Sequence, residues 1–227
     1  MKSYSGFTLA EVLITLGVIG VVAAMTMPVL INDIQGRQLQ SALKKSYSTI
    51  SQALDMYYVE NGERFVASNQ SRILKPILIK YIKNVRDCGY GTDEKSCVYR
   101  YDDRDYDTFK DIYKNFNGTN DIFIPYFDDG QFVINDGSLV MIENQPNSFY
   151  NYISIDVNGY RKKPNRLGQD VFMFQIMPDG KLLPMGMEGT AYNKNTYCSL
   201  TSESGMNGAG CTVKALSEKD FFKNLPK

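Results

Sequence analysis

Residues 7–31 read FTLAEVLITLGVIGVVAAMTMPVLI, and this stretch decides the fold. Its only charged residue is Glu11. About 20 consecutive apolar residues are enough for a helix to cross a bilayer. The stretch therefore predicts a transmembrane helix near the N-terminus. A carboxylate inside such a helix costs about 3 kcal/mol, so Glu11 is expected to have a partner.

The six residues before this stretch, MKSYSG, differ from those of an ordinary secretory signal. A secretory signal has a shorter apolar run, of roughly 7–15 residues, and a small-residue cleavage site after it. Here the apolar run is longer, and the small residue, Gly6, comes before it. Cleavage after Gly6 would leave the whole apolar segment on the mature chain, which would begin at Phe7.

This start resembles the prepilin cleavage and methylation motif, G|FTLxE, of type IV pilins and type II secretion pseudopilins, at Lys2, Gly6, Phe7, Thr8, Leu9 and Glu11. The resemblance implies that a prepilin peptidase cuts between Gly6 and Phe7 and methylates the new amine of Phe7. Residues 1–6 would then be a leader peptide. Pro28 stands where many of these proteins also have proline.

After cleavage, Glu11 would lie one helical turn from the positively charged amine of Phe7. In a lone helix its carboxylate favours the N-terminal end of the macrodipole. In a bundle it can pair with the amine of a neighbouring subunit, which would set the axial register between subunits during assembly. An ordinary signal anchor with a stray glutamate is the bland alternative.

The resemblance implies a structural subunit of a type IV pilus-like or type II secretion pseudopilus filament. The alternative is a minor pilin at the filament tip, acting in binding, adhesion or assembly initiation. The implied partners are identical or related pilin subunits, the prepilin peptidase, and an inner-membrane assembly platform with its ATPase. The implied location is the bacterial inner membrane, as a single-pass protein with an extracytoplasmic head, and then an extracellular or periplasmic filament.

The composition of the chain argues against two classes of function, nucleic-acid binding and enzymatic catalysis. The chain has 227 residues with 25 basic and 25 acidic side chains, so nucleic-acid binding is not indicated. It contains no histidine, which removes the usual general base and every Ser-His or Cys-His arrangement. We therefore expect no enzymatic activity and no catalytic residues.

The fold class expected is α+β, in which one long helix packs on an antiparallel β-sheet head in a pilin-like layout. The transmembrane or filament-core half of this long helix covers residues 7–31. In the half over 32–60 an apolar stripe recurs at steps of three and four, through Leu39, Leu43, Tyr47, Ile50, Leu54 and Tyr57. Pro28 lacks an amide proton and Gly36 adds freedom, so a kink or melted turn is expected between them.

Residues 61–227 are expected to form the globular head. Helical spacing predicts short helices over 72–85 and 102–115. From residue 121 the period falls to two, and strand-like runs are separated by Asp129-Gly130, Asp136-Gly137 and Asp179-Gly180. Asp-Gly pairs favour type I′ hairpins. They indicate an antiparallel meander of four to six strands, with one face on the long helix and the other partly solvated.

The four cysteines form two local pairs along the chain, Cys88 with Cys97 and Cys198 with Cys211. Neither pair is a C-x-x-C, so a zinc site is not indicated. An exported head lies in an oxidising place, where disulfides persist. Three connectivities exist, and we expect the two local ones, each worth about 3 kcal/mol. Four free buried thiols are the alternative.

One loop, residues 155–172, offers the only candidate ligand site. Asp156, Asn158 and Asp170 supply side-chain oxygens, which suit a hard cation such as Ca²⁺. No glutamate follows at the spacing of an EF-hand, and the same loop carries the cations Arg161, Lys162, Lys163 and Arg166. The alternative is a turn-rich connection whose side chains bind their own backbone. The sequence therefore predicts no cofactor, with Ca²⁺ at this loop as the one candidate.

Overall fold

The computed structural model describes residues 6, 8–66, 72–98, 112–145 and 150–226. One long helix carries a six-stranded antiparallel sheet with strand order β1-β2-β3-β4-β5-β6. The elements are α1 Leu9–Asn61, α2 Leu74–Tyr81, β1 Asn84–Asp87, η1 Ile124–Tyr126, β2 Gly130–Ile134, β3 Leu139–Gln145, β4 Tyr150–Asp156, β5 Val171–Ile176, β6 Leu182–Pro184, η2 Ala209–Cys211, α4 Thr212–Ser217 and η3 Phe221–Lys223. This is the expected α+β, pilin-like layout.

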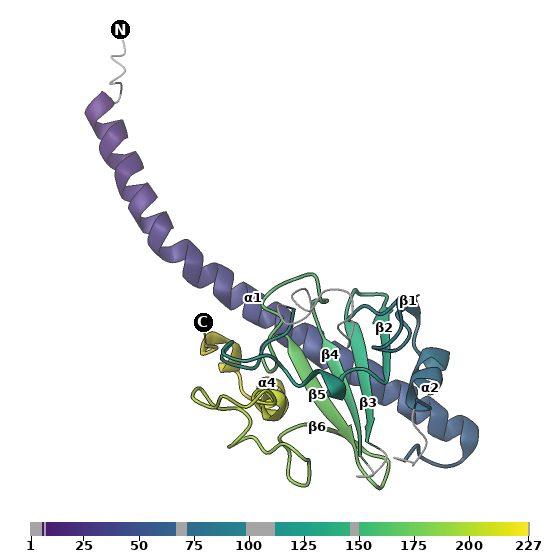
Figure 1. Ribbon diagram of the computed structural model, residues 1–227. Helices are drawn as coiled ribbons and strands as arrows, with labels where there is room; N and C mark the ends of the chain where they lie inside the picture. Colours follow the sequence, from purple (N-terminus) through teal and green to yellow (C-terminus); the bar gives the residue numbers. More distant parts are fainter. Residues whose placement is uncertain (1–5, 7, 67–71, 99–111, 146–149, 227) are drawn as a thin grey trace.

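Helix α1 has 53 residues and is about 80 Å long. Its second half lies against the sheet, and its first half projects from the head (Figure 1). The expected melted turn is absent, because α1 stays helical through Pro28 and Gly36. Figure 1 shows a smooth curve instead.

The expected role of Gly36 is also wrong. Gly36 is buried, and a Cβ atom built on it would lie 2.9 Å from the Cβ of Phe222 in η3. The missing side chain of Gly36 thus lets η3 pack closely on α1, and it does not serve to let α1 bend.

The sheet packs on the second half of α1 through the predicted stripe. Leu43, Ile50 and Leu54 of α1 are almost fully buried. They share one core with alternate residues of the strands, namely Phe132, Ile134, Val140, Ile142, Ile153, Ile155, Phe172, Phe174 and Ile176. The period of two along each strand therefore places one set of side chains on the helix.

The opposite face of the sheet is covered and not partly solvated, which corrects the sequence expectation. Met141, Val171 and Met173 point to this side and are completely buried. They form a second core with irregular segments that cross the sheet, through Cys88, Val98, Tyr113, Ile122, Phe127, Met206 and Ala209. Long connections with few regular elements thus make the second layer of the head.

Two expected elements differ from the structure. The helix expected over 72–85 ends at Tyr81, and β1 begins at Asn84 as an edge strand paired with β2. The first strand-like run, which was expected to begin at residue 121, is irregular and contains the short η1 turn. Of the helix expected over 102–115, residues 102–111 lie outside the described residues, and 112–115 are not helical.

The Asp-Gly pairs form hairpins at two of the three expected places. Asp136-Gly137 joins β2 to β3, and Asp179-Gly180 joins β5 to β6. Only the glycines have positive φ, 91° and 77°, so these are not type I′ turns. They match the three-residue loop in which a type I turn precedes a left-handed glycine. Asp129-Gly130 makes no hairpin, because Gly130 already begins β2.

Candidate functional site

The first half of α1 is an apolar surface that none of the described residues of the head covers. Leu9 is 78% exposed, Ile19 63% and Leu30 60%. Within the part of the chain that the structure describes, α1 is the one helix long and apolar enough to cross a membrane. A continuous apolar surface of this size marks contact with lipid or with other protein.

Glu11 takes part in a capping box at the start of α1. The carboxylate Oε2 of Glu11 accepts hydrogen bonds from the backbone N–H of Thr8, at 2.8 Å, and from its hydroxyl, at 2.9 Å. In return, the backbone N–H of Glu11 donates to Oγ1 of Thr8 at 3.3 Å. The pair satisfies donors that a helix N-terminus leaves open. The single chain therefore gives the carboxylate a local partner inside the apolar half.

This capping box was missed at the sequence level, although Thr8-x-x-Glu11 has the spacing of one. The two roles of Glu11 are compatible, since Oε1 makes none of these bonds. Phe7, the expected site of cleavage and methylation, lies outside the described residues, and so does most of the leader. Gly6 is described and exposed.

In the loop from β4 to β5, both candidate carboxylates are already hydrogen-bonded. Asp156 accepts from the Tyr113 hydroxyl at 2.6 Å and from the Gly159 N–H at 2.8 Å. Asp170 accepts from the N–H groups of Asn165, at 2.8 Å, and Arg166, at 2.7 Å. The loop thus holds its own backbone, as the alternative reading of the sequence expected.

Burial and, second to it, the charge of nearby Asp170 together raise the pKa of Asp156 to about 7. Burial also raises the pKa of Asp170 to about 6, against the lowering effect of its two backbone donors. Both carboxyls are therefore easier to protonate than free aspartate. Tyr113 could not have been linked to Asp156 from sequence, because 43 residues separate them.

The fit of this loop to a calcium ion is mixed. The side-chain oxygens of Asn158 and Asn165 are buried and have no hydrogen-bond partner, which leaves acceptors for a ligand. Four donors already occupy the two carboxylates, and a cation would have to displace them. Calcium at Asp156, Asn158 and Asp170 therefore stays a prediction. It requires that Ca²⁺ raise the melting temperature of the chain and that Asp170→Asn abolish the rise.

A second acidic group lies at the other end of β3. The carboxylates of Asp128, Asp129 and Glu143 come within 4.8 Å of one another. Adjacent carboxylates are usually solvated, but Asp128 is only 5% exposed. Asp129 also pairs with Arg72 at 3.6 Å.

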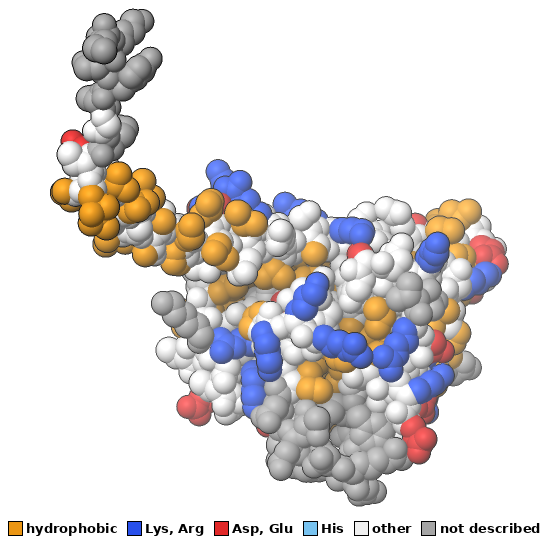
Figure 2. Space-filling model, turned by 90° about the horizontal axis from the view of Figure 1, so that it is seen from above, with side chains coloured by type: hydrophobic (Ala, Val, Ile, Leu, Met, Phe, Trp, Pro, Cys, Tyr) orange, Lys and Arg blue, Asp and Glu red, His pale blue; other side chains and the backbone are white. Residues whose placement is uncertain are grey.

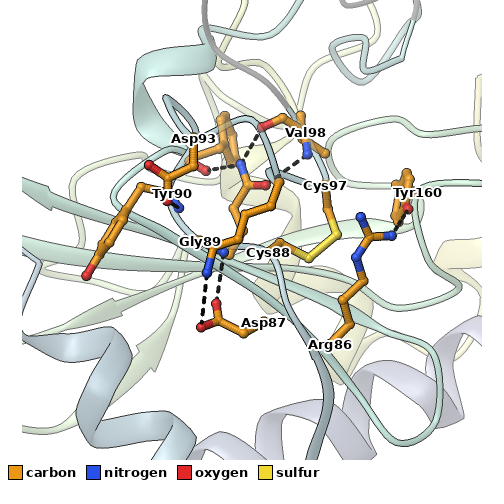
Figure 3. The surroundings of a disulfide bond; sticks show 12 residues. Arg86, Asp87, Cys88, Gly89, Tyr90, Asp93, Cys97, Val98 and Tyr160 are labelled. Atoms are coloured by element: carbon orange, nitrogen blue, oxygen red, sulfur yellow. Dashed lines mark hydrogen bonds and ion pairs between the residues drawn. A yellow bond between two sulfur atoms is a disulfide. The ribbon is translucent and has the colours of Figure 1, made fainter.

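Both cysteine pairs form disulfides in the structure, Cys88–Cys97 and Cys198–Cys211. Figure 3 shows the first, at the end of β1. The Gln131 side chain supports this loop by donating to the Val98 carbonyl at 2.6 Å and accepting from the Val98 N–H at 2.9 Å. The second disulfide joins Cys198 to Cys211 at the end of η2, directly before α4. The Cys88–Cys97 disulfide lies in the core on the outer face of the sheet, whereas Cys198 and Cys211 pack with the core on the α1 side.

Comparison with known proteins identifies the N-terminal segment. Residues 1–27 match the family model of the prokaryotic N-terminal methylation motif. This motif is the signature of type IV pilins and pseudopilins, so the chain carries that signature on a pilin-like α+β layout. No curated protein and no solved structure matches the chain significantly.

Proposed function

We propose that this chain is a structural subunit of a type IV pilus-like or pseudopilus filament. In the proposal, a prepilin peptidase removes residues 1–6 and methylates Phe7. The first half of α1 then anchors the mature chain in the inner membrane until assembly. Assembly transfers that half from lipid into a bundle with the same segment of other copies. The methylation motif supports the processing step, because it is the signature of subunits that are processed in this way.

The observation that carries the proposal is the contrast between the head, whose described residues pack around two cores, and the first half of α1, whose apolar side chains are exposed. Apolar side chains from Leu9 to Ile34 are exposed on all sides of α1. A helix that is apolar all round belongs inside lipid or inside a larger protein core. The same surface can serve in the membrane before assembly and in the filament afterwards.

Mass spectrometry of the mature chain tests the processing step. We expect a chain that starts at N-methylated Phe7 and is four hydrogens lighter than its reduced form, because it keeps both disulfides. A mature chain that retains residues 1–6 would contradict the proposal.

Replacing Glu11 tests the assembly step. Because Glu11 is the only charge in residues 7–31, Glu11→Gln removes the one strong polar contact available between neighbouring apolar halves. We expect sheared filaments to fall at least about tenfold, while the amount of membrane-inserted chain stays the same. Thr15→Ala is the control, since its hydroxyl bonds only to the Val12 carbonyl in the same helix. Normal filaments from Glu11→Gln would contradict a role in subunit register.

A further inference from the structure

Basic side chains gather on one face of the head, although the chain as a whole has no net charge. Figure 2 looks at the molecule from above, which is the side toward which the first half of α1 rises in Figure 1. Lys and Arg side chains lie across the middle of this face, and most Asp and Glu side chains lie near its rim (Figure 2). The charge is therefore distributed unevenly with respect to the membrane anchor.

The contacts of α1 show which end of the sheet faces the anchor. The hairpin from β2 to β3 is tied to α1 by an ion pair between Asp136 and Lys45, at 2.8 Å. At the opposite end of the sheet, Gly180 packs on Arg64, just beyond the end of α1. Strand β3 begins beside the end of β4, and β4 ends beside the start of β5, so the loop from β4 to β5 lies at the Lys45 end. That loop therefore lies on the side of the apolar half.

A pocket of about 330 Å³ opens at this end. It is lined by Arg86 of β1 and by Tyr160, Arg161 and Lys162 of the loop. Arg86 Nη1 donates to the Tyr160 hydroxyl at 3.3 Å, and the two side chains point toward each other in Figure 3. The Arg161 guanidinium lies 5.5 Å from the centre of the Tyr160 ring.

Among the residues that the structure describes, no acidic side chain forms an ion pair with the cations of this pocket. Arg86, Arg161 and Lys162 are in none of the described ion pairs, whereas eight other cations of the head are, namely Arg64, Arg72, Lys75, Lys80, Lys95, Lys114, Lys181 and Lys223. Asp136, the acidic residue of the nearby hairpin, is occupied by Lys45. Arginine forks match the geometry of phosphate oxygens, and tyrosine is enriched where protein meets the bilayer surface.

We propose that this pocket binds the phosphate of an anionic phospholipid headgroup in the bilayer that holds α1. Because α1 curves, the edge of the head that carries the loop lies at about the level of the middle of the helix (Figure 1). The head then rests on the membrane surface before assembly and leaves it when the subunit is extracted. The proposal rests on the membrane stage of the proposed function.

Hydrogen–deuterium exchange of the full chain in lipid nanodiscs tests the proposal. In discs containing phosphatidylglycerol, we expect amide exchange over 157–163 to be at least about fivefold slower than in phosphatidylcholine discs, since each cation near an anionic surface contributes a factor of this size. High salt should remove most of the difference. Arg161→Gln with Lys162→Gln should abolish it.

The matched control is Lys181→Gln with Lys194→Gln, which removes the same charge from two exposed lysines outside the pocket and should keep the protection. Equal exchange in both lipids, or equal loss in the control, would overturn the proposal. The same protection from inorganic phosphate in phosphatidylcholine discs would also overturn it, in favour of a soluble anion. Failure of the chain to enter discs would instead overturn the membrane stage of the proposed function.

Discussion

The two halves of α1 belong to one continuous helix but have opposite surroundings. In the second half, Leu43 and Ile50 are buried at 0% and 1% exposure under the sheet. In the first half, Leu13 and Ile19 are exposed at 61% and 63%. The head therefore buries the apolar side chains of only the second half of α1. The comparison indicates that the fold of the head and the assembly of the filament depend on separate residues.

The largest expected difference between the halves is in the stability of the head. Ile50→Ala should lower the free energy of unfolding by about 2–5 kcal/mol, because it removes a buried side chain and leaves a cavity. Ile19→Ala should change the stability of the head by less than about 0.5 kcal/mol. Denaturant unfolding of the full chain in detergent measures both. Similar losses from the two variants would mean that the halves are not independent.

Two glycines sharpen the same comparison. Gly36→Ala should destabilise the head by about 1–3 kcal/mol, because the added Cβ meets Phe222. Gly20→Ala should cost nothing, since no atom lies within 4 Å of the added Cβ and alanine favours the helix. Thermal unfolding in detergent checks the pair. A harmless Gly36→Ala would show that the C-terminal turn does not pack tightly on α1.

The free energy of unfolding of the head should depend on pH, because a buried carboxyl group in it has a raised pKa. The pKa of Asp156 is about 7 in the folded chain against an ordinary value of 3.8, so the folded state binds more protons. This contribution is complete below about pH 4 and is lost as pH rises through 7, with a slope of up to about 1.4 kcal/mol per pH unit.

Asp156→Asn should reduce that slope between pH 4 and 7 and leave the smaller contribution of Asp170, whose pKa is raised to about 6. The exposed Asp179 has a lowered pKa because Lys181 is its hydrogen-bond partner, so Asp179→Asn should leave the slope in this range unchanged. Melting temperatures measured at several pH values give both slopes. An unchanged slope in Asp156→Asn would contradict the assignment to this carboxyl.

Periodicity in the sequence was enough to predict α1 and the strands from β2 to β6. Periodicity did not predict the elements whose structure depends on contacts between residues far apart in the sequence. Edge strand β1 was taken for the end of a helix, because its four residues have no clear alternation and pair with β2, which is far along the chain. The second core was not expected either, since segments without regular structure have no periodic signal.

The candidate sites also divide into those that a local sequence pattern predicts and those that only the folded chain brings together. The methylation motif is a local pattern of contiguous residues, so sequence alone predicts the processing site. The bonding of Asp156 by Tyr113 depends on the folded chain, and so does the basic pocket between Arg86 and the loop from β4 to β5. Composition gave no hint of that pocket because the net charge of the chain is zero.

The central claim is that other copies of this chain cover the first half of α1. Photo-crosslinking in cells tests it most directly, with a photoreactive phenylalanine derivative placed either at Ile19 or at Tyr58, which is exposed in the second half. We predict a ladder of crosslinked copies from position 19 that disappears when the prepilin peptidase is removed, and a much weaker ladder from position 58. No ladder from position 19 in cells that process the chain would contradict the account.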